Sequence, residues 1–383
     1  MESMKLGRGL PRRIVREIFS KLVISDLPNL RLISKTWNDM VLDYANSSHH
    51  EFLTNAFFLS TCDNRLDPRN LKMHCIRFDT TKHLDVDFDL ESEWTKSSSL
   101  CFDGEWTFMA IMNYCSGLLL ICKCANYTRC DGIFNPMTNE FLQVPRGQLD
   151  NDIYYFGFGF TTTTKQYKLF RVCDSFSRNC EFESGSIMDV LTFSRSGTNA
   201  NHNQWRYLHY LPLDIHSNGA YLNGFIYWIG KEEEKENEYA IYVLDVETEK
   251  IELSIVLEIC PPLCTSKVGG MQQFNDSVYA IFLINQPTGN SIQVWRMQEK
   301  DLWIREFVVD DIPNDWNVLT LIKAFEDGEI LCMVNFDFFC WYNPLTGRKK
   351  IITKNEKKIR YVCQIQSLNF GYLPNILAGD PPA

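Results

Sequence analysis

The cysteines are the first residues whose chemistry needs an interpretation. The chain has fourteen, and Cys122, Cys124 and Cys130 form one group while Cys260 and Cys264 form another. A structural zinc site generally combines two spaced pairs of Cys or His, and neither group has a clear second pair. We therefore interpret these residues as buried or loop thiols of a reduced protein, and we predict no metal and no other cofactor.

Two other patterns could carry chemistry but lack the parts it requires. Gly157-Phe158-Gly159 lacks the third Gly and the following helix of a dinucleotide-binding loop, so it predicts a strand whose glycines allow close packing. His49-His50 has no matching ligand cluster. The chain has neither a Gly-x-Ser-x-Gly elbow nor a phosphate loop. We therefore expect no catalytic residues.

A charged segment and a set of aromatic residues are candidates for binding rather than catalysis. Residues 231–238 read Lys-Glu-Glu-Glu-Lys-Glu-Asn-Glu and predict a solvated loop, with an acidic contact for a basic substrate as the alternative. Large aromatic side chains on strands are mostly core, yet they are also frequent binding hot spots. The residues in question are Trp205, Trp228, Trp295, Trp303, Trp316 and Trp341.

An apolar helical face near the N-terminus predicts a binding surface for a partner. After Pro11, which suits a first helical turn, apolar residues recur at helical spacing up to Leu22. Ser25 or Asp26 could begin a second short helix with Leu27, Leu30 and Ile33. Ser34 could cap a third helix, on which Trp37, Met40, Val41 and Tyr44 share a face. So short a segment rarely buries enough surface to fold alone, and its apolar face is typical of an interface.

These helices resemble an F-box, the module through which substrate receptors bind the Skp-type adaptor of cullin ubiquitin ligases. The residues that match the family pattern are Leu10, Pro11, Ile14, Val15, Glu17, Ile18, Leu22, Leu27, Leu30, Ser34, Lys35 and Trp37. The resemblance implies adaptor contacts by Leu10, Pro11, Ile14, Val15, Ile18, Leu22, Leu27, Leu30, Ile33, Lys35 and Trp37. The alternative is an ordinary helical cap on a larger domain.

The segment departs from the F-box pattern at four positions. Arg12 and Arg13 replace the usual acidic residues, and positive charge in a first helical turn is mildly unfavourable. Val23 replaces a common Pro, and Pro28 replaces a usual Leu. We expect these changes to weaken adaptor binding without abolishing it.

From about residue 52 the sequence consists of short β-like runs separated by turn signals. Asn223-Gly224, between Tyr221-Leu222 and Phe225-Ile226, predicts a two-residue hairpin turn. Turn motifs beginning at Asp79, Asn135, Asp245 and Asn343 suggest a repeat of about 50 residues, with missing copies near 194–195 and 297–298. We predict an α+β multidomain protein in which an all-β domain of about six propeller blades follows the helices. A pair of β-sandwiches is the alternative.

The β region also resembles the F-box-associated, kelch-like domain of plant F-box proteins. The resemblance rests on residues 117–145, on 155–160 with 167–169, on 223–228 and on the second Asn-Pro motif at 343–344. We predict an F-box at 1–48, a substrate domain at 49–375 and a tail at 376–383. The resemblance implies a non-catalytic substrate receptor of an SCF-type ligase that contacts the adaptor and, through it, cullin and RING subunits. A binding protein outside a ligase, or a propeller lectin or enzyme, is the alternative; the protein substrate and its binding residues stay unknown.

Composition limits the other partners and the compartment. The 383 residues are 45% hydrophobic and carry a formal net charge of −10. An acidic chain is a poor ligand for nucleic acid. No run reaches the roughly 18 apolar residues of a membrane span, and residues 1–9 lack the apolar core of a signal peptide. We expect a protein of the cytoplasm, the nucleus or both, which binds neither nucleic acid nor membrane.

Overall fold

The computed structural model describes most of the chain in segments. They are residues 11–21, 30, 33–47, 56–62, 71–77, 108–125, 128–135, 140–145, 155–174, 185–193, 204–212, 214–231, 237–259, 264–287, 289–325, 327–335, 338–352 and 358–364. Several predictions concern residues outside these segments. They concern Leu10, Leu22, Val23, Leu27, Pro28, His49-His50, the turn at Asp79, the copy at 194–195, Cys260 and the tail at 376–383.

Two N-terminal helices pack against each other as an amphipathic pair. Helix α1 spans Arg12–Lys21 and α3 spans Lys35–Ser47. Ser34 caps α3, because its Oγ accepts a hydrogen bond from the backbone N–H of Trp37 at 3.3 Å. The rings of Phe19 and Trp37 lie 5.9 Å apart between the helices. The predicted first and third helices are therefore confirmed over these ranges.

Strands β1 to β10 and the C-terminal strand β24 form three sheets. The first sheet has the order β2-β1-β24, the second β3-β4-β5-β6 and the third β10-β9-β8-β7. The bounds are β1 Ala56–Cys62, β2 Leu71–Arg77, β3 Phe108–Cys115, β4 Leu118–Ala125, β5 Thr128–Asn135, β6 Glu140–Gln143, β7 Tyr155–Phe160, β8 Tyr167–Asp174, β9 Ser186–Thr192, β10 Arg206–Leu211 and β24 Lys358–Gln364. All pairings in these sheets are antiparallel.

The remaining strands form three further antiparallel sheets. Their orders are β11-β13-β14-β15 with β12 also on β13, then β16-β17-β18-β19, then β20-β21-β22-β23. The bounds are β11 Asp214–Ile215, β12 Ala220–Leu222, β13 Phe225–Lys231, β14 Glu238–Asp245, β15 Ile251–Glu258, β16 Thr265–Phe274, β17 Ser277–Asn285, β18 Asn290–Glu299, β19 Leu302–Ile312, β20 Leu319–Ala324, β21 Ile330–Val334, β22 Phe338–Tyr342 and β23 Lys349–Ile352.

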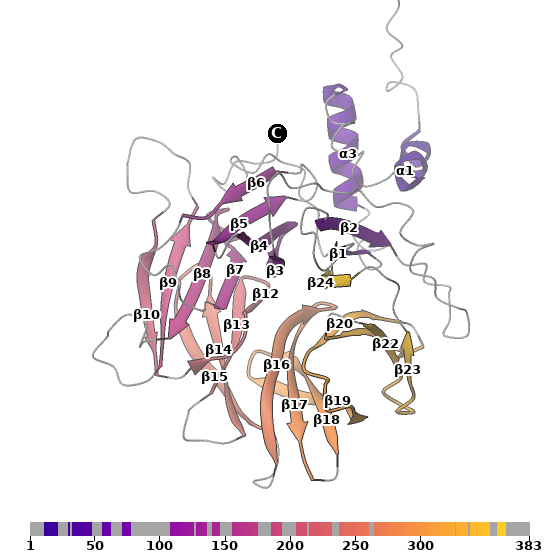
Figure 1. The fold of residues 1–383 in the computed structure, drawn as a ribbon. Helices are drawn as coiled ribbons and strands as arrows, with labels where there is room; N and C mark the ends of the chain where they lie inside the picture. The colour runs from indigo at the N-terminus through magenta and orange to yellow at the C-terminus, as the bar shows by residue number, and fades with distance from the viewer. Residues whose placement is uncertain are drawn as a thin grey trace, which may run out of the picture.

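The sheets stand around a common axis as the blades of a propeller (Figure 1). Their inner strands contact one another in the closed sequence β3, β7, β12, β16, β20, β24 and back to β3. The C-terminal β24 pairs with the N-terminal β1 and so closes the ring. Five sheets have at least four strands and the sixth has three within the described residues, in agreement with the predicted propeller of about six blades. The β-sandwich alternative is wrong, because two packed sheets cannot produce this ring.

The apolar cores lie between neighbouring blades. One buried cluster joins the β3–β6 blade to the β7–β10 blade, a second joins the latter to the β11–β15 blade, and two more continue around the ring. Close approach depends on glycine, as predicted for the Gly157-Phe158-Gly159 strand. A Cβ atom on Gly157 would lie 2.2 Å from Cζ2 of Trp228, on the facing blade.

Local turn chemistry connects the strands within each blade. Asn223 and Gly224 have φ angles of +49° and +89° and join β12 to β13 with Leu222 opposite Phe225. Both φ angles lie in the left-handed region that a two-residue type I′ hairpin requires. The predicted Asn-Gly hairpin is confirmed.

Two of the predicted repeat copies, at Asp245 and Asn343, form the same turn between the third and fourth strands of a blade. Asp245 Oδ1 accepts hydrogen bonds from the N–H groups two and three residues on, at 2.8 and 3.1 Å. Asn343 Oδ1 does the same at 3.0 and 3.1 Å. The predicted copy at 297–298 is misplaced, because both residues lie within β18 and the turn comes after Glu299.

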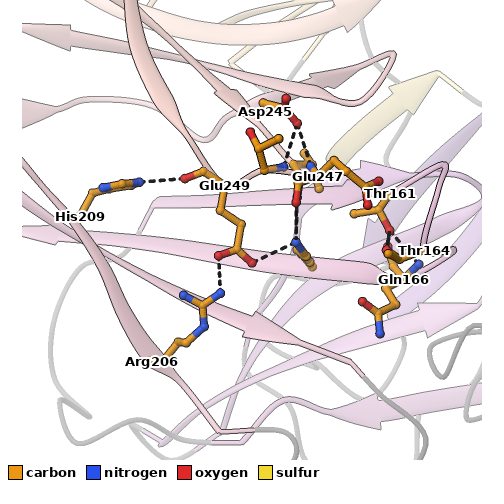
Figure 2. A network of polar contacts seen from close by, with 11 residues as sticks. Thr161, Thr164, Gln166, Arg206, His209, Asp245, Glu247 and Glu249 are labelled. Carbon is orange, nitrogen blue, oxygen red and sulfur yellow. Dashed lines mark hydrogen bonds and ion pairs between the residues drawn. The ribbon is translucent and has the colours of Figure 1, made fainter.

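The first of these turns is held on the neighbouring blade by an ion-pair network (Figure 2). Arg206 on β10 pairs with the carboxylate of Glu249, and the imidazole of His209 lies 2.8 Å from the Glu249 carbonyl oxygen. Lys168 on β8 lies 2.9 Å from the same carboxylate and also donates to the carbonyl oxygen of Val246. The turn therefore fixes two blades relative to each other.

One sequence interpretation needs correction, and the strand register adds detail to the interpretation of the cysteines. Asn237 is not part of a solvated loop, since it is buried, accepts a hydrogen bond from Ser266 Oγ and donates one to the Cys264 carbonyl. Cys122 lies opposite Asp131, the residue after Cys130, so the two cysteines are on opposite faces of the β4–β5 pair. These two thiols therefore cannot ligate one metal ion in this fold.

Candidate functional site

The two N-terminal helices expose apolar side chains beside a buried interior. Val15, Phe19 and Val41 are 5%, 1% and 0% exposed. Ile14 and Ile18, one turn apart on α1, are 43% and 38% exposed, and Ile33 before α3 is 60% exposed. Residues four apart share a helix face. We call the three exposed residues Ile14, Ile18 and Ile33 the isoleucine surface. This surface remains available to a partner.

The other predicted adaptor contacts are distributed between surface and interior. Pro11 and Lys35 are exposed, and Leu30 and Trp37 are partly buried. Val15, also a predicted adaptor contact, is buried in the helix pair, so its side chain is not available to a partner in this conformation. Arg13 is exposed, and the first turn of α1 contains no acidic residue to complement the helix dipole.

The propeller carries a second candidate site, a cavity of about 360 Å³ at its axis. Inner strands β3, β7, β16 and β20 and the segment 216–221 contribute to its wall. Asn113 Nδ2 donates to the Gly219 carbonyl at 2.7 Å and to the Phe156 carbonyl at 3.1 Å, and Asn218 Oδ1 accepts from the Phe156 N–H at 2.8 Å. These two amides fix the wall where three blades meet.

The cavity wall carries no charged carboxylate, ammonium or guanidinium group among the described residues. Burial raises the pKa of Tyr155 and Tyr221, so both phenols stay protonated at neutral pH. Burial also lowers the pKa of His216, with Asp214 opposing this effect and Lys231 adding to it. The imidazole is therefore mainly neutral at pH 7.

The tryptophans do not line this cavity. Trp228, Trp303, Trp316 and Trp341 are buried in the blades. Trp205 is partly buried, donates through its Nε1 to the Pro145 carbonyl at 2.8 Å and stacks under Arg171. In the described part of the chain, no cluster of three or more His, Cys, Asp or Glu side chains has the arrangement of a metal site.

Sequence reasoning did not identify the cavity residues. Asn113, Ser217 and Thr320 come from three blades and have more than 200 residues between the first and the last. No short motif contains them. The Asn-Gly hairpin that follows Ser217 was the nearest recognisable signal.

Comparison with known families now assigns the two parts of the chain. Residues 9–46 match the F-box domain, and residues 77–349, well over half of the chain, match the F-box associated beta propeller domain. The chain belongs to the F-box associated beta propeller family. The isoleucine surface thus lies in the F-box, and the axial cavity lies in the F-box associated propeller.

Relatives from Arabidopsis thaliana are named as F-box proteins. The chain is 24% identical to F-box protein At3g07870, with 91% of this chain and 89% of that protein covered. It is 27% identical to At1g62270, named as an F-box/kelch-repeat protein, over 60% of this chain and 56% of that protein. These are plant F-box proteins, as the resemblance implied.

Among solved structures, the chain is similar to TolB from Acinetobacter baumannii. The identity is 8%, the TM-score is 0.46, and the similarity covers 85% of this chain and 70% of that one. Within the described residues, neither helix has the length and apolar character needed to cross a bilayer.

Proposed function

We propose that this protein is the substrate-recognition subunit of an SCF-type cullin ubiquitin ligase. The F-box would bind a Skp-type adaptor, and through it cullin and RING subunits, while the propeller holds a protein substrate. The observation that carries the proposal is the isoleucine surface within a matched F-box, on the same chain as an F-box associated propeller. The protein would act in the cytoplasm, the nucleus or both.

The proposed role needs no catalytic residue in this chain. A receptor that holds a substrate near a conjugating enzyme raises the local concentration of substrate lysines, which accelerates transfer by proximity. The neutral wall of the axial cavity and the buried state of Cys115, Cys332 and Cys340 agree with a binding protein.

The adaptor interface can be tested without disturbing the F-box core. Ile14→Glu combined with Ile18→Glu places two charges on exposed positions of α1, while Val15 and Phe19 stay unchanged. We expect loss of a Skp-type adaptor in a pull-down, because burying an unpaired carboxylate in an interface is costly. Leu345→Glu, at a residue 88% exposed on a propeller turn, is the matched control and should retain the adaptor.

The outcome separates the ligase role from adaptor binding alone. Capture of adaptor, cullin and RING subunits by the unmodified chain, and of none by the double variant, supports the proposal. Undiminished adaptor capture by the double variant contradicts the interface. Capture of adaptor without cullin from cells contradicts the ligase role. Mass spectrometry of captured proteins with and without proteasome inhibition would then identify substrates.

A further inference from the structure

The axial cavity contains a hydrogen-bonding group that the fold leaves unused. Ser217 lies in the wall, is 5% exposed, and its Oγ has no hydrogen-bond partner among the described residues. A buried hydroxyl without a partner costs free energy, so such groups usually have one. The neighbouring amides of Asn113 and Asn218 are by contrast engaged with backbone groups. The Ser217 Oγ has almost no accessible surface, so it donates to a molecule in the cavity once the side chain rotates about its Cα–Cβ bond.

The wall favours an uncharged occupant. The described lining includes apolar side chains such as Ile111, Met112 and Met271 together with phenols such as Tyr114. A carboxylate or ammonium group moved into these surroundings would lose hydration without gaining a counter-charge. A neutral molecule with an apolar or aromatic body loses much less on entry, and methionine sulfur packs well against aromatic rings.

The size of the cavity fits a small organic molecule. Its volume of about 360 Å³ falls within the range of roughly 300–1,000 Å³ that is typical of small-molecule sites. Such sites combine a mainly apolar wall with a few polar groups that fix orientation. Ser217 and the neutral His216 are polar groups of this kind at one side of the cavity.

We propose that the axial cavity is a binding site for an uncharged small molecule with an aromatic body and a hydrogen-bond acceptor, which receives a hydrogen bond from Ser217. This site lies in the propeller and its occupation does not depend on adaptor binding. The two proposals can therefore fail separately.

The test uses two probes that differ in charge but hardly in shape, 4-hydroxybenzamide and 4-hydroxybenzoate. Binding to the purified full chain is followed by saturation-transfer NMR at millimolar concentration. We expect the amide to bind at least about tenfold more tightly than the carboxylate, because the carboxylate must enter without a counter-charge.

Two variants assign binding to the cavity. Ser217→Ala should weaken amide binding about fivefold, the effect of one lost hydrogen bond. Thr320→Trp, which fills the cavity from the wall on β20, should abolish it even if Ser217→Ala does not fold. Ser254→Ala, at a partly buried hydroxyl on β15 that is not part of the cavity lining, is the control and should bind like the unmodified chain.

Three results would overturn the proposal. If neither probe gives a saturation-transfer signal, the cavity holds solvent only. Equal binding of the two probes would contradict selection for an uncharged molecule. Unchanged amide binding by Thr320→Trp would place the amide elsewhere on the protein.

Discussion

Lys168 Nζ lies 2.9 Å from Oε1 of Glu249, across the junction between two propeller blades. The two side chains are only 9% and 16% exposed, so this ion pair is largely withdrawn from water. Removing one partner of a buried pair leaves the other uncompensated, whereas exposed pairs contribute little. The pair therefore gives a direct test of how much the blade junction stabilises the propeller.

Lys168→Met should destabilise the protein by about 3 kcal/mol, because Glu249 loses a buried partner and two backbone carbonyls lose a donor. Urea unfolding measures the change. The control is Lys300→Met, which breaks an equally short pair with Glu252 whose side chains are 44% and 64% exposed. That change should cost less than about 1 kcal/mol. Equal costs would contradict a structural role for the junction.

Acid should weaken the same junction. Burial alone would raise the pKa of Glu249, but the hydrogen bonds from Arg206 and Lys168 outweigh it, and the pKa is lowered from 4.5. The stability that this ionised carboxylate contributes is complete above pH 4.5 and disappears as the pH falls through the lowered value.

Glu249→Gln should therefore be less stable than the unmodified protein at pH 7. The difference between the two unfolding free energies should shrink as the pH falls below 4.5. Denaturant titrations at several pH values measure it. A difference that does not change with pH would mean that the ionised form of Glu249 contributes nothing to stability.

The glycine strand gives a steric prediction. Gly157→Ala should destabilise the propeller by about 1–3 kcal/mol, because the added methyl group overlaps the indole of Trp228 on the facing blade. Trp228→Phe removes the overlapping ring atoms. The double variant should therefore be more stable than the sum of the two single effects implies. Purely additive free energies of unfolding in this cycle would contradict the proposed contact.

Cys332 and Cys340 should resist alkylation in the folded protein. They lie opposite each other on β21 and β22, and burial raises the pKa of Cys340 to about 11 and that of Cys332 well above its usual value. The thiolate is the reactive form. Mass spectrometry after iodoacetamide treatment at pH 8 should find both modified only when urea is present, whereas the half-buried Cys130 should be modified without urea. Rapid modification of Cys332 without urea would contradict this packing.

Local patterns in the sequence predicted local structure correctly. The spacing of Val15 and Phe19 identified a helix, and Ser34 identified the start of another. Asn223-Gly224 identified a hairpin, and Asp245 and Asn343 identified equivalent turns. Each of these features depends on backbone geometry and side-chain alternation within a few residues, which sequence spacing records directly.

The sequence misplaced one copy of the repeat, because the turn of that copy begins with a different type of residue. The turn at Lys300-Asp301 lacks the Asx residue that marked the other copies at their first position, so the predicted copy fell inside β18. Similarly, Asn237 ends a charged run in the sequence, yet its amide is buried by contacts with Cys264 and Ser266, which come later in the chain.

By itself, the sequence determined that this protein joins a short helical F-box to a repeated β domain. Only the tertiary structure decided that Ile14 is exposed while the adjacent Val15 is buried, and that Lys168 meets Glu249. Only the closed ring placed Asn113, Ser217 and Thr320 around one cavity. The reason is physical: helices and turns follow from neighbouring residues, whereas burial and long-range contacts depend on how whole blades pack around the axis.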